Sequence, residues 1–214
     1  YDRKKALEAS IEMLKKVQIP HPEARVKEYP HQMSGGMRQR VMIAMALACN
    51  PEILIADEPS TALDVTIQAQ VLDLMLQLKK TYDTAIILIT HDLGVIAEVA
   101  EKVAVMYAGQ IVEEADVEAL FEDPLHPYTR ALLQSIPVLG ERFEKEGRVE
   151  LNEIKGIVPS LYELPRGCNF YPRCPEAESK CNKTAIPLIS TKDNRKVRCI
   201  LYTQVEGSTF TVPG

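Results

Sequence analysis

The chain has 214 residues, of which 46% are hydrophobic and 26% charged, and its formal net charge is −5. These values suit a globular protein with one sizeable core and a smaller appendage. The negative charge argues against nucleic-acid binding through bulk electrostatics, and the longest uninterrupted apolar run, residues 41–49, is too short to span a bilayer. No basic-then-apolar leader opens the sequence, so nothing in it predicts export.

The first 80 residues alternate between helical and strand patterns. Apolar residues at helical spacing predict an amphipathic helix at 3–17, and the three prolines of 19–32 mark a connector. A second helix is predicted at 37–49. The short apolar run at 52–59 is typical of a buried parallel strand, and a longer helix is predicted at 65–80.

Strands and helices continue to alternate in the next part of the chain. A second buried strand is predicted at 84–91 and a short helix at 92–101. Residues 102–115 predict two strands joined at Ala108–Gly109, and a helix follows within 123–137. This order predicts the α/β class, with a parallel sheet and flanking helices.

The character of the sequence changes after Pro137. A polar connector punctuated by Pro and Gly replaces the regular patterns, and a cysteine-bearing tail follows it. We therefore place a boundary near 137–140, between a domain at 1–137 and a small irregular C-terminal extension at 138–214.

Two predicted strands end in chemically active residues, one at Asp57–Glu58 and the other at Thr90–His91. Ligands of open parallel sheets bind beyond the carboxyl ends of the strands, so neighbouring strands would gather these groups on one rim. Asp57 is a suitable ligand for Mg²⁺. Glu58 can orient or deprotonate a water, and we expect the negative charge of Asp57 beside it to keep its proton affinity high enough for a base. His91 is placed to donate to a γ-phosphate.

Ser34, Gly35 and Gly36 precede the helix predicted at 37–49. A helix N-terminus offers free N–H groups and a partial positive charge, and glycines let the backbone approach a ligand closely. The three residues therefore predict an anion site, with a plain helix cap as the alternative.

The segments MSGGMRQR, ILIADEP, STALD and THD occur in this order. Together they closely resemble the ATPase subunit of ATP-binding-cassette (ABC) transporters, which has a P-loop NTPase fold, and the resemblance spans residues 3–137. It implies binding of ATP and Mg²⁺, with Glu58 as the catalytic carboxylate. The other implied roles are the signature motif at Ser34, Gly35 and Gly36, the second acidic motif ending at Asp57, the interface loop from Ser60 to Asp64, and the switch histidine at His91.

The sequence contains no Gly-x-x-x-x-Gly-Lys-Ser/Thr phosphate loop. In the family this loop lies upstream of the region that matches Tyr1, so we expect a fragment that begins after the loop and is inactive alone. The resemblance also implies two subunits that clamp ATP head to tail, each ATP lying between one phosphate loop and the other subunit's signature motif. A second ABC ATPase subunit, identical or related, is therefore an expected partner.

The segment PLHPYTRALLQSIP indicates which group of ABC transporters the sequence resembles. Its His126-Pro127-Tyr128 opens an extension similar to that of oligopeptide and dipeptide importers. The implied function is to power uptake of short peptides, or of related solutes such as nickel complexes, in a bacterium or archaeon. Implied partners are membrane permease subunits and, indirectly, a solute-binding protein, with no nucleic acid. The implied location is peripheral, on the cytoplasmic face of the cell membrane.

Four of the five cysteines, Cys168, Cys174, Cys181 and Cys199, lie in the predicted extension. Clustering without an export signal favours metal binding over disulfides. Paired Cys-x2-Cys knuckles are absent, and four thiolates on irregular loops suit a [4Fe–4S] cluster, with zinc or reduced structural cysteines as alternatives. The pattern also resembles that of dipeptide-importer ATPases, for which such a cluster is expected. Cys49 is predicted to be a small core residue.

Two other functions stay open at this point. One is a DNA-repair or chromosome-maintenance ATPase, which shares the signature and acidic motifs, although the sequence contains no heptad array for a long coiled coil. The other is a metal-binding regulatory subunit that contributes half of a nucleotide site and has no ATPase activity of its own.

Overall fold

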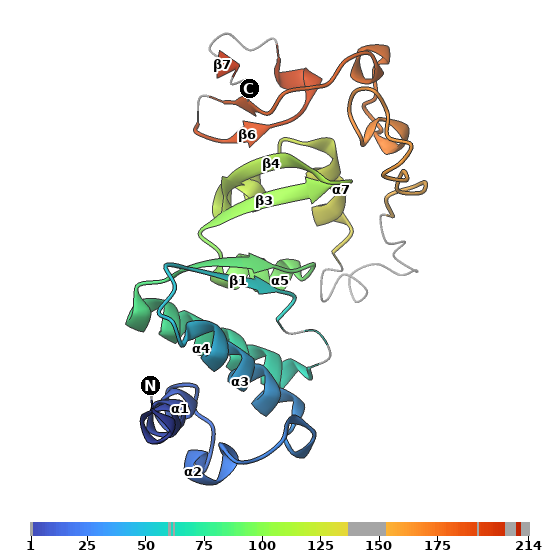
Figure 1. Cartoon of the computed structure of the whole chain (residues 1–214). Coiled ribbons are helices and arrows are strands. Elements are labelled where there is room, and N and C mark those ends of the chain that lie inside the picture. Colours follow the sequence, from blue (N-terminus) through green and yellow to red (C-terminus); the bar gives the residue numbers. More distant parts are fainter. Residues whose placement is uncertain are drawn as a thin grey trace, which may run out of the picture. The chain divides into compact units, whose positions relative to one another are not determined.

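The computed structural model describes residues 2–59, 61, 63–136, 153–191 and 193–203, and the backbone of 209–210. The chain divides into two compact units, Tyr1–Val95 and Ile96–Gly214 (Figure 1). Helix α5 (Leu93–Val99) spans this division. The boundary predicted at 137–140 lies outside the described residues and stays a prediction.

The first unit contains a two-stranded parallel sheet with helices on one of its faces (Figure 1). Strand β1 (Ile53–Asp57) pairs with β2 (Ala85–Ile89) so that Asp57 lies opposite Ile89. This parallel pairing confirms the predicted α/β class and sets the two strand ends side by side. The helical elements of the unit are α1 (Arg3–Lys16), α2 (Pro22–Arg25), the 3-10 helix η1 (Pro30–Gln32), α3 (Gly35–Leu47) and α4 (Val65–Tyr82).

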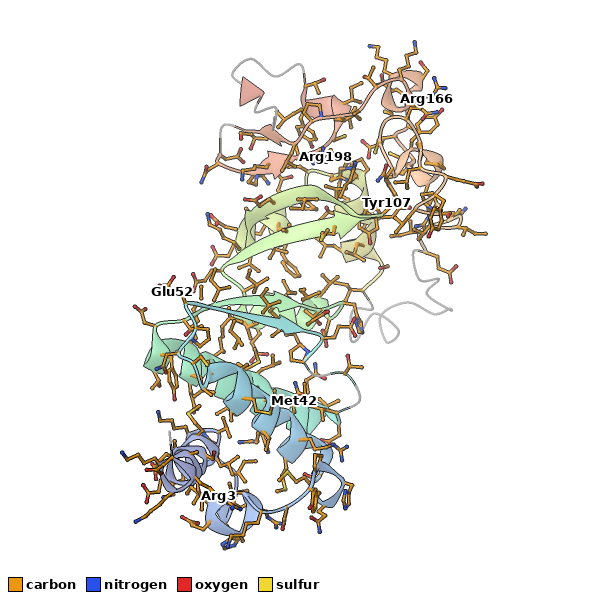
Figure 2. The ribbon with its side chains drawn as sticks, in the orientation of Figure 1. Arg3, Met42, Glu52, Tyr107, Arg166 and Arg198 are labelled. Carbon is orange, nitrogen blue, oxygen red and sulfur yellow. The ribbon has the colours of Figure 1, made fainter. Side chains whose placement is uncertain are left out.

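The core of the first unit lies between its helices and the sheet. Val17 at the end of α1, Leu47 of α3 and Val71 of α4 are almost completely buried in one apolar cluster. Burying each such side chain stabilises the fold by about 1.5–3 kcal/mol. Met42, by contrast, lies on the exposed side of α3 (Figure 2), so only one side of this helix is buried in the core.

The two faces of the parallel sheet differ. Leu54 and Ala56 of β1 pack into the cluster, whereas Ile55 is 64% exposed. In β2, Ile87 and Ile89 are exposed in the same way. Successive side chains of a strand point to opposite faces, so the sheet has one face covered by helices and one apolar face that is exposed.

The second unit opens with the predicted hairpin. Strands β3 (Lys102–Tyr107) and β4 (Gln110–Asp116) pair antiparallel. Their turn has positive φ angles at Ala108 and Gly109, 44° and 80°, as a two-residue hairpin turn requires. Helix α6 (Val117–Glu122), which we did not predict, follows directly, and helix α7 (Pro127–Gln134) lies within the predicted range.

The tail adds short elements to this hairpin. The sheet order is β3-β4-β6-β5-β7, and all four pairings within it are antiparallel. The added strands are β5 (Ile189–Ser190), β6 (Lys196–Val197) and β7 (Thr209–Phe210), and the 3-10 helices are η2 (Tyr171–Arg173), η3 (Ser179–Asn182) and η4 (Ile200–Tyr202). Phe170, fully buried, packs against Tyr107 and Tyr128, and so joins the tail to the hairpin and α7.

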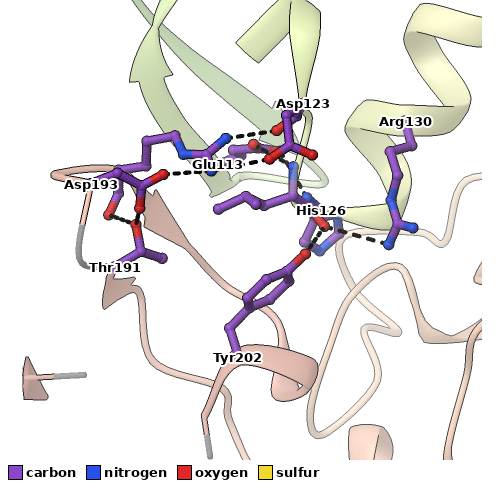
Figure 3. A network of polar contacts seen from close by, with 9 residues as sticks. Glu113, Asp123, His126, Arg130, Thr191, Asp193 and Tyr202 are labelled. Carbon is purple, nitrogen blue, oxygen red and sulfur yellow. Dashed lines mark hydrogen bonds and ion pairs between the residues drawn. The ribbon is translucent and has the colours of Figure 1, made fainter. Parts of the chain in front are cut away.

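A buried carboxylate holds the start of α7. Glu113 of β4 accepts the backbone N–H groups of Leu125 and His126 at 2.7 and 2.8 Å (Figure 3). His126 Nδ1 in turn accepts the N–H of Tyr128 at 3.0 Å and caps the helix, with Pro127 in its first turn. The His-Pro-Tyr tripeptide is therefore a helix start tied to the sheet. No helix in the described part of the chain has the length and apolar character needed to cross a membrane.

Candidate functional site

Glu58 is held in a strained backbone conformation directly after β1. Its φ of 43° is left-handed, which is costly for a residue with a Cβ. Its N–H donates to the carbonyl of Ile89 at 2.9 Å, and its carbonyl accepts the N–H of Thr61 at 3.1 Å. Strain of this kind persists only where the surroundings impose it, and it gathers at functional sites.

The Glu58 side chain meets residues from two loops. Its Oε1 lies 3.1 Å from Nδ1 of His91, and its Oε2 accepts the hydroxyl of Thr61 at 2.8 Å. Parallel pairing of β1 and β2 therefore does bring the carboxylate and the imidazole to one rim. Both side chains face solvent, with 47% of Glu58 and 82% of His91 exposed, so a ligand can reach them.

The electrostatics of Glu58 differ from our expectation. Hydrogen bonds from Thr61 and then His91 lower the pKa of Glu58 below its ordinary value. The expectation that its neighbour Asp57 would sustain the proton affinity of this carboxylate is wrong in this structure, because the hydrogen-bond donors Thr61 and His91 stabilise the charged form. Glu58 is thus an anion that accepts hydrogen bonds, ready to orient a water.

A groove surrounds this pair. Asp92 stands at its edge and caps α5, accepting the N–H of Gly94 at 2.9 Å, and Gln68 of α4 donates to Asp92 at 3.4 Å. Asp57 is exposed at the end of β1, directly before Glu58 in the sequence, but it is not among the residues that line the groove. The residues that line the groove are Glu58, Thr61, Leu63, Gln68, Thr90, His91 and Asp92.

The Ser-Gly-Gly segment forms the start of α3. Ser34 is exposed and its Oγ accepts the N–H of Met37 at 3.3 Å, so it is an N-cap, and Gly35 and Gly36 form the first helical turn. A Cβ on Gly36 would come within 2.7 Å of Ile67 Cγ2. The helix-cap alternative is therefore what the structure contains, and Gly36 has a packing role that sequence reasoning missed. The segment is not part of the groove around Glu58, and its anion-binding role stays a prediction.

The remaining predicted nucleotide residues belong to the loop between β1 and α4. Asp64 is the N-cap of α4, and its Oδ1 accepts the N–H of Ile67 at 3.0 Å. An Asp directly before an apolar helical pattern is a typical N-cap, so this role could have been predicted from the sequence. Ser60 lies outside the described residues, so its predicted place at an interface stays untested.

The four tail cysteines surround one pocket. Cys168, Cys174, Cys181 and Cys199 are free thiols, and all four line it. Gly167 has no room for a Cβ, which would collide with the carbonyl oxygen of Cys181. This close approach brings the segments around Cys168 and Cys181 together, and the N–H of Cys168 donates to the carbonyl of Cys181 at 2.7 Å.

The pocket is not a ready site for a single metal ion. Within the described ranges, no group of three or more His, Cys, Asp and Glu side chains could hold one. Burial is the main reason that the pKa values of Cys174 and Cys199 rise to about 11, so these groups are neutral thiols at neutral pH. The predicted [4Fe–4S] or zinc site therefore gains no direct support here. Cys49, predicted as a core residue, is exposed just beyond the end of α3, so that prediction is wrong.

Comparison with known proteins identifies both parts of the chain. Residues 3–61 match the family described as "ABC transporter", and residues 112–181 match "Oligopeptide/dipeptide transporter, C-terminal region". The chain is 56% identical over 200 residues to the oligopeptide transport ATP-binding protein AppD of Bacillus subtilis, covering 94% of this chain and 60% of that protein. It is 52% identical over 212 residues to the dipeptide transport ATP-binding protein DppD of Haemophilus influenzae, covering 99% of this chain and 62% of the relative.

The comparisons also found a third relative and one solved structure. The dipeptide transport ATP-binding protein DppD of Escherichia coli is 50% identical over 190 residues, covering 89% of this chain and 57% of the relative. A solved dimeric ATP-binding cassette with ADP and Pi bound has 30% identity and a TM-score of 0.47, covering 55% of this chain and 49% of its own. The chain thus spans about three fifths of the length of its curated relatives.

The Glu58–His91 pair at joined strand ends and the two family matches define a class, the ATP-binding-cassette proteins. Within that class the chain belongs to the oligopeptide/dipeptide transporter family.

Proposed function

We propose that the chain is part of an ATP-hydrolysing subunit that powers an ABC importer of dipeptides or oligopeptides. The observation that carries the proposal is the contact of 3.1 Å between Glu58 and His91 at the carboxyl ends of two paired strands. The names of the relatives, oligopeptide and dipeptide transport ATP-binding proteins, support the transported class of solute.

The proposed roles follow from the chemistry of each group. Glu58 orients the attacking water and draws its proton, while Nδ1 of His91 contacts that carboxylate and the other ring nitrogen, Nε2, is left to contact the γ-phosphate. Asp57, exposed at the end of β1, is the ligand for Mg²⁺, whose charge would offset that of the phosphates. Ser34 and Gly36 contribute to an ATP bound mainly by another subunit, with Ser60 and Asp64 at that interface.

The proposed partners extend beyond this chain. They are a second ABC ATPase subunit, membrane permease subunits and, indirectly, a solute-binding protein. The proposed location is the cytoplasmic face of the cell membrane, where the subunit is held through the permeases. The family membership of both parts of the chain supports this assignment.

Exchange of Glu58 for Gln tests the proposal in the full-length protein that contains this sequence. We expect hydrolysis to fall by about 10²–10⁴-fold, because the amide cannot accept the proton, while ATP binding persists. Glu52→Gln, at an exposed carboxylate just before β1, is the matched control and should hydrolyse ATP normally. Normal hydrolysis by Glu58→Gln would refute the role of this residue.

A second candidate is a regulatory subunit that completes half of a nucleotide site. The observation in its favour is that these 214 residues contain no Gly-rich Lys-Ser/Thr phosphate loop. The gene sequence immediately upstream of Tyr1 decides between the two. An in-frame phosphate loop there would support the ATPase, and its absence would support the regulatory subunit.

We further propose that Cys168, Cys174, Cys181 and Cys199 hold a [4Fe–4S] cluster. One observation supports it: all four thiols line one pocket. The absence of paired Cys-x2-Cys knuckles in the sequence favours a cluster over zinc. Binding a cluster would release the protons of its thiol ligands and would tie together a tail that consists of short elements.

Anaerobic purification with assays of iron, sulfide and zinc tests this proposal. We expect a brown protein with about four irons and four sulfides per chain. Cys181→Ser should lose the colour, and Cys49→Ser, at the one cysteine outside the pocket, should keep it. A colourless protein with one zinc would replace the cluster by a zinc site. A protein without metal would show that the four residues are reduced structural cysteines.

A further inference from the structure

Thr61 contacts Glu58 at two points. Its backbone N–H donates to the Glu58 carbonyl at 3.1 Å and closes a turn, and its hydroxyl donates to Glu58 Oε2 at 2.8 Å. His91 meets the other carboxylate oxygen, Oε1, at 3.1 Å. Each oxygen of the carboxylate is therefore engaged by a different loop, and all three side chains line one groove.

This arrangement limits what the Thr61 hydroxyl can do. A hydroxyl has one proton to donate, and here that proton is committed to Glu58. It is therefore not available to bind a phosphate oxygen at the same time. A glutamate side chain has three rotatable bonds, and an exposed one samples many rotamers unless both ends of its carboxylate are held.

We infer that Thr61 is a positioning residue that fixes the Glu58 carboxylate beside His91 through its hydroxyl. The inference rests on the proposed ATPase function and adds Thr61 to the residues of the proposed site. Misplacing a catalytic group by about 1 Å can cost up to 10²-fold in rate. Loss of the hydroxyl should therefore slow hydrolysis while nucleotide affinity, which depends on other groups, stays the same.

Two substitutions separate the hydroxyl from the rest of the side chain. Thr61→Val has nearly the same shape but no donor, and Thr61→Ser keeps the donor and loses the methyl group. In the full-length protein we expect Thr61→Val to lower the single-turnover hydrolysis rate about 10–100-fold, with the Kd for ATP and the Tm close to those of wild type. Thr61→Ser should restore most of the rate. In a Glu58→Gln background, Thr61→Val should have no further effect.

The outcomes distinguish this inference from the proposed function. If Glu58→Gln stops hydrolysis but Thr61→Val turns over like wild type, the inference is overturned and the proposed function stands. Equal impairment of the Val and Ser variants would also overturn it, because the loss would then come from the methyl group or the loop. If Glu58→Gln hydrolyses ATP normally, both the inference and the proposed role of Glu58 are wrong.

Discussion

Single residues in this chain often have two roles at once. Ser34 and Asp64 are predicted motif residues, and the structure shows that they are also the N-caps of α3 and α4 respectively. Gly36 is a predicted motif residue and also the position where α3 lies too close to Ile67 of α4 for a side chain. A substitution at such a residue therefore changes stability as well as chemistry, and the two effects must be measured separately.

Gly36→Ala should destabilise the first unit. Its Cβ would come within 2.7 Å of Ile67 Cγ2, and this methyl group sits on a stiff β-branched carbon that cannot swing away. We expect a loss of about 1–3 kcal/mol in the free energy of unfolding, measured by urea denaturation. Gly35→Ala is the control, because its Cβ would lie at an ordinary 3.5 Å from Leu63 Cδ2. Similar losses in both variants would contradict the packing explanation.

At the scale of elements, the start of α7 depends on a single carboxylate. Glu113 is fully buried on β4 and accepts two backbone N–H groups of the turn before the helix. On the other side of that turn, the hydroxyl of Tyr202 donates to the carbonyl of Leu125 at 3.1 Å (Figure 3). The His-Pro-Tyr tripeptide alone does not reveal this partner, because Glu113 lies 13 residues before His126.

Glu113→Gln should therefore weaken the second unit. The carboxylate of Glu113 offers one oxygen to each of the two N–H groups, whereas a glutamine amide has a single acceptor oxygen. The NH₂ group of the amide would face one of these N–H donors without an acceptor. We expect the free energy of unfolding to fall by about 1–3 kcal/mol. Glu114→Gln next to it should cost no more than about 1 kcal/mol, since its ion pair with Lys196 at 2.9 Å is partly exposed. Equal effects of the two changes in urea denaturation would rule out the special role of Glu113.

At the scale of the whole molecule, the parallel sheet leaves an apolar face exposed. Ile53, Ile55, Ile87 and Ile89 all lie on this face, and each is about half exposed or more. Parallel sheets are normally covered on both faces, and a contiguous exposed apolar patch marks a contact surface. We therefore expect this face to be covered when the sheet is in its working context.

The 214-residue chain by itself should associate through this face. Sedimentation at rising concentration should show growing assemblies, and an apolar dye should bind. Ile55→Glu should reduce both signals, because it places a charge in the middle of the patch. Val65→Glu, at an exposed apolar residue at the start of α4 rather than on the sheet, should reduce neither. Unchanged association in Ile55→Glu would show that another surface is responsible.

The regular elements could be predicted because their signals are local. The helices at α1, α3 and α4 and the strands β1 and β2 were expected within a few residues of their observed bounds, since apolar spacing determines which face of an element can be buried. Helix α6 was missed because six residues are too few to show a period. Cys49 was misplaced because an apolar run does not say which of its residues face outward.

The order of the motifs by itself determined the family, and strand patterns determined that Asp57, Glu58 and His91 would lie at the ends of buried strands. Only the tertiary structure decided that β1 and β2 are neighbours and that Glu58 meets both His91 and Thr61. It also decided that four cysteines share a pocket without a single-ion site. The physical reason is that spacing along a chain limits which side chains can meet, whereas distance, burial and hydrogen-bond partners depend on contacts between segments that are remote in the sequence.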